Sequence, residues 1–213
     1  IIFTHRVISC NIILLKRIIS TLCFTISIAC ESFSVCWSDD FQKGMEAYKK
    51  CDFANAIKEW ILLGEDGDEK AQYFLGLIYY KGKGVPQNYK KALKWYTLSA
   101  EQGNKVAQYN LGVMYSFGLG VVPDYKTALK WYNLSSEQGY ALAQYNLGRL
   151  YYLGNGVKEN MVYAHMWVNL AFLNGFEMVE EINKLLIEIM TPSQIQEAQK
   201  LAIECVKNNY KGC

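Results

Sequence analysis

Residues 107–142 read AQYNLGVMYSFGLGVVPDYKTALKWYNLSSEQGYAL, and this stretch decides the fold because residues 71–106 repeat it without a gap. The two segments are identical at 21 of 36 positions, and their anchor residues return a third time after residue 142. These anchors are Ala71, Ala107 and Ala143; Gly76, Gly112 and Gly148; Tyr79, Tyr115 and Tyr151; Trp95, Trp131 and Trp167; Gly103, Gly139 and Gly175. A fixed period of this length is typical of a solenoid, in which each unit covers the next.

Each unit contains two segments with helical periodicity. Apolar residues recur at helical spacing over residues 71–79, which predicts a first helix. Gly82 and Gly84 interrupt the pattern, Pro86 is predicted to open a second helix, and Gly103 is predicted to end it with a left-handed cap. We therefore predict an all-α, right-handed α/α superhelical solenoid of antiparallel helix pairs with a 36-residue repeat.

The glycine in the middle of the first helix needs a compensating contact. Gly76 costs about 1 kcal/mol of helix propensity relative to Ala. We expect this glycine, like Gly112 and Gly148, to allow close contact between helices, and we expect Trp95 and its equivalents to fill the space between units.

The repeat divides the chain into six segments. Residues 143–178 form a degenerate unit, because Lys158 and Glu159 replace the proline region and Val168 replaces the tyrosine that follows the tryptophan. Thr191 and Pro192 are predicted to be the N-cap and first residue of a late helix. The predicted boundaries are 1–29 for a signal peptide or membrane anchor, 38–70 for an N-terminal capping repeat, 71–106, 107–142 and 143–178 for the repeats, and 179–213 for a C-terminal helical cap.

Four short motifs carry a family resemblance. AQYNLGVMY at 107–115, GLGV at 118–121, ALKWY at 128–132 and SEQG at 136–139 resemble the Sel1-like repeat family, relatives of the tetratricopeptide repeats. The resemblance implies a non-catalytic protein-protein interaction adaptor or scaffold, with a binding groove along the first helix of each unit. We expect a monomer that binds a protein or peptide ligand on its concave face.

The candidate partner-binding residues lie beside the packing anchors of the first helices. They are Tyr73, Tyr109, Asn110, Tyr145, Asn146 and Arg149. The tyrosines would offer aromatic area, the asparagines amides and Arg149 a charged donor to an extended peptide. The alternative is that the rings pack between helices and the asparagines bond to neighbouring backbone. The lining is expected to extend to Leu77, Tyr80, Val113, Phe117, Tyr152 and Leu153.

The sequence contains no motif that assembles a catalytic site, and we predict no enzyme activity, cofactor or metal site. Serine-hydrolase, β-lactamase, zinc-protease and P-loop signatures are all absent. The G-x-G elements recur in every unit and are interpreted as tight connections. His165, aligned with Leu93 and Leu129, is interpreted as a structural residue, and Gln102 and Gln138 as solvated surface residues. The net charge of +2, from 22 basic and 20 acidic residues, argues against a nucleic-acid partner.

The N-terminal residues have the shape of a signal peptide. Lys16 and Arg17 precede an apolar stretch at 18–29, shorter than the roughly 18 to 20 residues that cross a bilayer. We therefore expect export to the periplasm or secretion, with cleavage before Cys30. The alternative is a membrane tether, through an uncleaved leader or a lipid on Cys30, although Ser27 stands where lipidation sites usually have Leu. Expected export also motivates an alternative function, as an envelope enzyme or cell-wall-binding factor of a β-lactamase-like or peptidoglycan-related kind.

The seven cysteines lie outside the three repeats at 71–178, since none occurs between Cys51 and Cys205. In an oxidising compartment Cys36 can pair with Cys51, or Cys205 with Cys213, and the sequence leaves this connectivity open.

Overall fold

The computed structural model describes residues 40–213, and every regular element in this part of the chain is helical. The expectations for the leader, Cys30 and Cys36 fall outside these residues. Residues 40–49 are helical. The elements that follow are α2 (Phe53–Glu65), α3 (Glu69–Lys81), α4 (Tyr89–Glu101), α5 (Lys105–Phe117), α6 (Tyr125–Ser136), α7 (Ala141–Leu153), α8 (Met161–Leu173), the 3-10 helix η1 (Glu177–Val179), α9 (Glu180–Ile189) and α10 (Pro192–Lys207).

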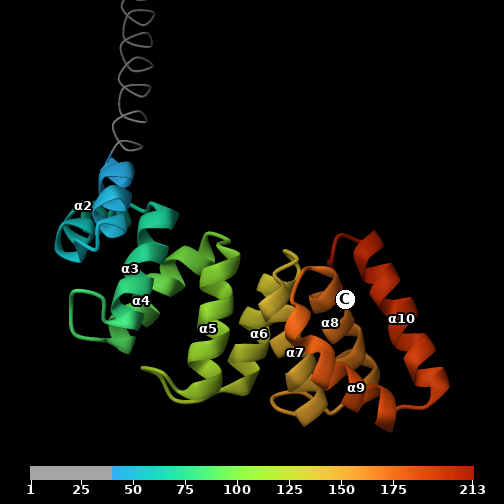
Figure 1. The fold of residues 1–213 in the computed structure, drawn as a ribbon. Helices are drawn as coiled ribbons and strands as arrows, with labels where there is room; N and C mark the ends of the chain where they lie inside the picture. Colours follow the sequence, from blue (N-terminus) through green and yellow to red (C-terminus); the bar gives the residue numbers. More distant parts are fainter. Residues whose placement is uncertain (1–39) are drawn as a thin grey trace, which may run out of the picture.

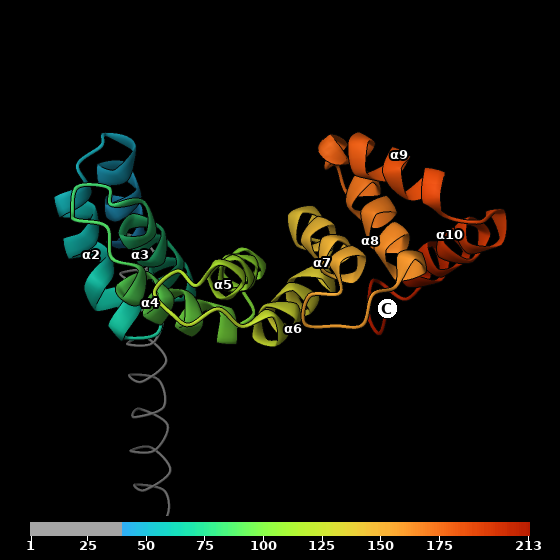
Figure 2. The same cartoon turned by 90° about the horizontal axis from the view of Figure 1, so that it is seen from below.

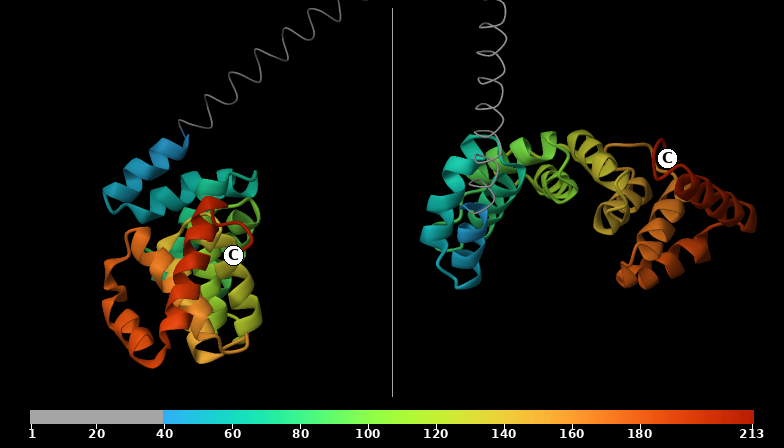
Figure 3. Two further views of the ribbon diagram at one scale, coloured as in Figure 1. Left: turned by 90° about the vertical axis from the view of Figure 1, so that its right-hand side faces the viewer. Right: turned by 90° about the horizontal axis from the view of Figure 1, so that it is seen from above.

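The helices stack side by side into an arch (Figure 1). Consecutive helices pair as α3 with α4, α5 with α6 and α7 with α8, and adjacent pairs meet through α4 with α5 and α6 with α7. Seen from below and from above, α5 and α7 line the concave side of the arch and α6 lies on the convex side (Figures 2 and 3). The all-α solenoid of paired helices is therefore confirmed. The first helix of each unit begins at residue 69, 105 or 141, two residues before the unit start taken from the sequence.

A glycine brings the two helices of each unit into direct contact. A Cβ atom on Gly76 would lie 2.5 Å from the ring of Tyr96, and one on Gly112 would lie 2.5 Å from the ring of Tyr132. In the third unit, Gly148 packs against Val168 and the carbonyl oxygen of Ala164. The contact that we expected to compensate for each glycine is therefore made by a side chain of the second helix, which packs directly against the glycine backbone. The same pairing recurs near the N-terminus, where Gly44 faces Trp60.

The prediction that Pro86 opens the second helix is wrong. Helix α4 begins at Tyr89, and the extended Asn88 caps it by accepting a 2.9 Å hydrogen bond from the backbone N–H of Lys91. The loop returns over the end of α3, because the backbone N–H of Asn88 donates to the carbonyl oxygen of Tyr79 at 2.9 Å. A polar cap after this return defines the helix start better than the proline does.

The cap at the end of the second helix agrees with the sequence. Gly103 has a φ of +100°, and its N–H donates to the carbonyl oxygen of Ala100. The next N–H, from Asn104, donates to the carbonyl oxygen of Ser99, and the two hydrogen bonds together form a Schellman motif. Thr191 and Pro192 likewise begin α10 as predicted, within a capping box that Gln194 completes.

Buried glutamines join one unit to the next. Gln72, Gln108 and Gln144 donate through Nε2 to the carbonyl oxygens of Gly64, Ala100 and Ser136, at 2.8, 3.1 and 3.3 Å. Each side-chain oxygen accepts a hydrogen bond from a residue 30 positions further along, namely Gln102, Gln138 and Asn174. Gln102 and Gln138 are exposed as expected, yet they also bridge the units. This ladder satisfies amides that would be costly to bury unpaired.

The C-terminal segment folds back on the third unit. Cys205 forms a disulfide with Cys213, one of the two pairs considered from the sequence, with Cα atoms 5.5 Å apart. The Tyr210 hydroxyl donates to Asn174 at 3.0 Å. Cys51, the other cysteine considered, is exposed, and its suggested partner lies outside the described residues. Within residues 40–213 no helix has the length and apolar character needed to cross a membrane.

The contact at Gly112 gives a first prediction. Replacing Gly112 with Ala should lower the free energy of unfolding by roughly 1–2 kcal/mol, because the new methyl group overlaps the Tyr132 ring and this overpacking outweighs the gain in helix propensity. Urea denaturation of purified protein measures the change.

A double-mutant cycle provides the control. The cost of Gly112→Ala should largely vanish in a Tyr132→Ala background, where the ring is absent. A stability gain on Gly112→Ala in the wild-type background would contradict the contact.

Candidate functional site

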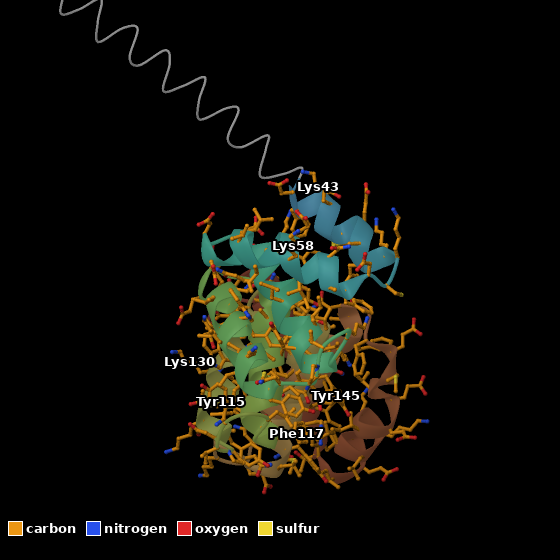
Figure 4. The ribbon with its side chains drawn as sticks, turned by 90° about the vertical axis from the view of Figure 1, so that its left-hand side faces the viewer. Lys43, Lys58, Tyr115, Phe117, Lys130 and Tyr145 are labelled. Atoms are coloured by element: carbon orange, nitrogen blue, oxygen red, sulfur yellow. A yellow bond between two sulfur atoms is a disulfide. The ribbon has the colours of Figure 1, made fainter. Side chains whose placement is uncertain are left out.

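The six predicted binding residues lie on three successive first helices. Tyr73 belongs to α3, Tyr109 and Asn110 to α5, and the remaining three to α7. All are half-buried except Arg149, which is exposed. Tyr145 lies on the side of the molecule that bears α9, whereas Lys130 of α6 projects on the opposite side (Figure 4).

The three tyrosine rings pack against neighbouring aromatic rings and keep part of their surface exposed. The Tyr73 ring lies 5.2 Å from that of Phe74 and 6.1 Å from that of Tyr96, measured between centroids. The corresponding distances are 6.0 Å from Tyr109 to Tyr132, 5.3 Å from Tyr109 to Tyr140, and 4.9 Å from Tyr145 to Phe176. The packing and binding interpretations of these residues are therefore compatible, since one edge is packed and another remains accessible.

Burial keeps the phenols of this face neutral. It raises the pKa of Tyr73 and that of Tyr109 above the ordinary value of 10, through desolvation of the charged form. A hydrogen bond from Asn146 to Tyr109 lowers the Tyr109 pKa, but by less than burial raises it. At physiological pH these groups can donate or accept a hydrogen bond but carry no charge.

Asn146 follows the backbone-bonding alternative made from the sequence. Asn146 donates through Nδ2 to the carbonyl oxygen of Leu142 at 3.0 Å, as the backbone-bonding alternative required. Asn110 lies half-buried beside Tyr109 on α5. Because Asn146 also contacts the Tyr109 side chain, the structure links predicted residues of two successive units.

A hollow of about 120 Å³ opens between α5, α6 and α7. Its lining includes two of the six predicted residues, Asn146 and Arg149, and does not include Tyr73, Tyr109, Asn110 or Tyr145. Its full lining is Ser116, Phe117, Tyr125, Tyr132, Asn146, Arg149, Leu150, Leu153 and Asn155. Phe117 and Leu153, predicted as extensions of the groove, form part of its wall.

The most polar part of the hollow was missed from the sequence. The Ser116 hydroxyl lies 3.5 Å from that of Tyr132, whose side chain is only 2% exposed. Burial raises the pKa of Tyr132 far above its ordinary value, although the hydrogen bond with Ser116 and the charge of Arg149 oppose the shift. The signal that could have revealed Ser116 is its departure from the repeat, because tyrosine stands at the equivalent positions 80 and 152.

Arg149 supplies a positive charge at this hollow. Its guanidinium lies 5.9 Å from the Tyr145 ring centroid, and its charge lowers the pKa of the Tyr132 phenol. No carboxylate within residues 40–213 forms an ion pair with it. Leu77 and Val113 occupy the same position in the first two units, so the charge is peculiar to the third.

His165 has a structural environment. It is 2% exposed on α8, with Nδ1 3.4 Å from the Asn169 amide nitrogen. Desolvation lowers its pKa below 6.5. The residue lies outside the lining of the hollow, which supports the interpretation of a packed histidine.

The second glycine of the G-x-G loops packs closely against neighbouring residues. A Cβ on Gly120 would lie 2.7 Å from the backbone of Tyr89, and one on Gly156 would lie 2.6 Å from the backbone of Tyr125. The second glycine of these loops thus rests on the preceding unit. The described residues contain no group of three His, Cys, Asp or Glu that could hold a metal ion.

A larger groove lies at the C-terminal end of the array. It has a volume of about 530 Å³ between α8 and α10, and apolar side chains such as Phe172, Leu173 and Ile203 dominate its lining. Few polar groups are available there to orient a ligand, in contrast to the hollow between α5 and α7.

Comparison with known proteins identifies the repeat. The sequence model of the Sel1 repeat matches residues 69–104, 105–140 and 141–176, including the unit interpreted as degenerate. A Sel1 repeat protein from Oxalobacter formigenes is similar in structure, with 28% identity, a TM-score of 0.67, and coverage of 80% of this chain and 77% of that chain.

A second solved structure is similar over part of its length. It is c5321, a protective antigen present in uropathogenic Escherichia coli strains that displays an SLR fold. It has 26% identity and a TM-score of 0.52 over 82% of this chain and 47% of that longer chain. No curated protein matches the sequence.

The buried histidine gives a prediction of pH dependence. Because the folded pKa of His165 lies below 6.5, the unfolded chain binds this proton at higher pH than the folded protein. The stability due to neutral His165 should be complete above about pH 6.5 and should be lost as the pH falls toward the folded pKa. Urea midpoints at several pH values between about 5 and 8 measure this loss.

The matched control replaces His165 with Leu, the residue at the equivalent positions 93 and 129. Stability of this variant should vary less with pH over the same range. An unchanged pH dependence would show that another group is responsible.

Proposed function

Because this chain belongs to the Sel1 repeat family, we propose that it is a non-catalytic adaptor that holds a partner protein on the concave face of its solenoid. Members of the family generally act as protein-interaction scaffolds. The observation that carries the proposal is the row of half-exposed tyrosines on α3, α5 and α7, which continues into the polar hollow beside Arg149.

The chemistry of this face suits an extended peptide. Rigid tyrosine rings offer contact area at low conformational cost, and their neutral hydroxyls hydrogen-bond to peptide groups. The rings are already held by neighbours such as Tyr140 and Phe176, so little side-chain freedom would be lost on binding. Repetition of the same position in three units extends the surface along the arch.

We also propose that the protein works outside the cytoplasm. The leader-like sequence at the N-terminus and the disulfide between Cys205 and Cys213 both support export, since disulfides persist mainly in oxidising compartments. Release after cleavage and tethering through the leader or Cys30 are the outcomes that the measurement of the N-terminus distinguishes.

Partner capture should depend on the concave tyrosine row. After crosslinking in the native cell, the double variant Tyr109→Ala and Asn110→Ala should recover the specific partner at least tenfold less than wild type, through loss of an aromatic anchor and an amide. Quantitative mass spectrometry of the recovered proteins measures this.

Lys130→Ala is the control, because Lys130 lies on the convex helix α6, and it should recover the partner normally. Thermal unfolding verifies that the double variant is folded. Equal partner recovery by folded double variant and wild type would contradict the proposed face. Turnover of muropeptides or of a chromogenic β-lactam that one polar substitution abolishes would instead favour the envelope-enzyme alternative.

Export predicts a particular N-terminus and thiol content. Mass spectrometry of protein from the native cell should find the chain beginning at Cys30, and a maleimide reagent should leave Cys205 and Cys213 unmodified until a reductant is added. An intact leader would show retention at the membrane, and a lipid on Cys30 would show anchoring. Free thiols at 205 and 213 in the freshly isolated protein would contradict an oxidising location.

A further inference from the structure

Ser116 and Arg149 are among the positions at which the lining of the hollow departs from the repeat. The residue near the end of the first helix is Tyr80, Ser116 and Tyr152 in successive units, so only the second unit has a small side chain there. At the position of Arg149, the first two units have the apolar residues Leu77 and Val113. Both departures occur at the junction of the second and third units, where the hollow lies.

The serine changes the surroundings of a buried phenol. In the first unit, the Tyr80 ring lies 6.2 Å from that of Tyr96 and 5.5 Å from that of Tyr89. The Tyr96 hydroxyl is buried there with no hydrogen-bond partner among the described residues. In the second unit Ser116 leaves room, and the hydroxyl of the equivalent Tyr132 borders the hollow at 3.5 Å from Oγ of Ser116.

The groups around the hollow form a donor set with one positive charge. Arg149 contributes a guanidinium, while Ser116, Tyr132 and Asn146 contribute a neutral hydroxyl or amide. The rim is apolar, because Phe117, Tyr125 and Leu153 are 65%, 40% and 51% exposed. The site therefore offers a small anion pocket inside an apolar frame.

The balance of charge favours a carboxylate over a phosphate. Arg149 is the cation in the lining, and a guanidinium can donate two parallel hydrogen bonds to one carboxylate. A phosphoryl group carries close to two negative charges at neutral pH and is typically bound by a cluster of arginines. No second Arg or Lys lines the hollow.

We propose that this hollow recognises a carboxylate of the bound peptide, next to an apolar side chain that packs on Phe117 and Leu153. This inference rests on the proposed adaptor function, because it specifies the peptide that the concave face selects. The carboxylate belongs either to an Asp or Glu side chain or to the C-terminus of the partner, and both present the same group to Arg149.

The experiment selects peptides with the purified full-length protein. Two libraries of random decapeptides serve as probes, one with free C-termini and one with the random segment fused within a carrier. Wild type should enrich peptides with a carboxylate beside an apolar residue. Enrichment only of free C-termini identifies a terminal carboxylate, and enrichment of Asp or Glu in the fused library identifies a side chain.

Three variants test the residues. Arg149→Leu introduces the residue of the equivalent position 77 and should weaken binding of the selected peptides about tenfold or more, while removing the preference for a carboxylate. Ser116→Tyr introduces the residue of positions 80 and 152 and should block the hollow with a similar loss. Lys130→Leu removes one positive charge from α6 and should bind like wild type.

The outcomes separate this inference from the adaptor function. Peptides that bind wild type and are lost on Tyr109→Ala, but show no preference for a carboxylate and bind Arg149→Leu equally well, would overturn the carboxylate pocket and leave the adaptor function intact. A selection that enriches no peptide in either library would count against both. A preference for phosphorylated over carboxylate peptides in a direct titration would replace the ligand class proposed here.

Discussion

The close approach of the two helices within each unit is the contact on which the rest of the structure depends. It requires a residue without a side chain at Gly76 and Gly112, because the ring of Tyr96 or Tyr132 occupies the place of a Cβ. The aromatic ring then fills the interface across the helix pair. The loss of helix propensity at glycine is offset by burial of a large aromatic surface.

The glutamine ladder extends this local pairing into one array. Each buried glutamine connects the end of one second helix to the next unit, so neighbouring units share hydrogen bonds as well as apolar contacts. Stability in such arrays comes from each unit and its nearest neighbours. A rigid frame of this kind allows surface residues to vary without changing the arch.

The candidate site contains surface residues that vary between units in this way. The buried Tyr132 is held by Gly112, while Ser116 and Arg149 differ from their equivalents in other units. Departures from the repeat in the lining, Ser116 and Arg149 among them, therefore accompany the change from a packed aromatic junction to a polar hollow. The same reasoning separates this hollow from the C-terminal groove, where the lining is mostly apolar and few groups would orient a ligand.

The sequence by itself determined the helix pairs, their 36-residue period, the mid-helix glycines and the Gly103 cap, because spacing and backbone preference act locally. It also placed Asn146 and Arg149 on the first helix of the third unit. Tertiary structure decided that α4 begins after Asn88 and not at Pro86. The reason is that the backbone N–H of Asn88 donates a hydrogen bond to the carbonyl oxygen of Tyr79, a contact that joins the loop to the preceding helix. It also decided that Ser116, Tyr132 and Arg149 border one hollow, because they come from three helices whose relative rotation depends on packing.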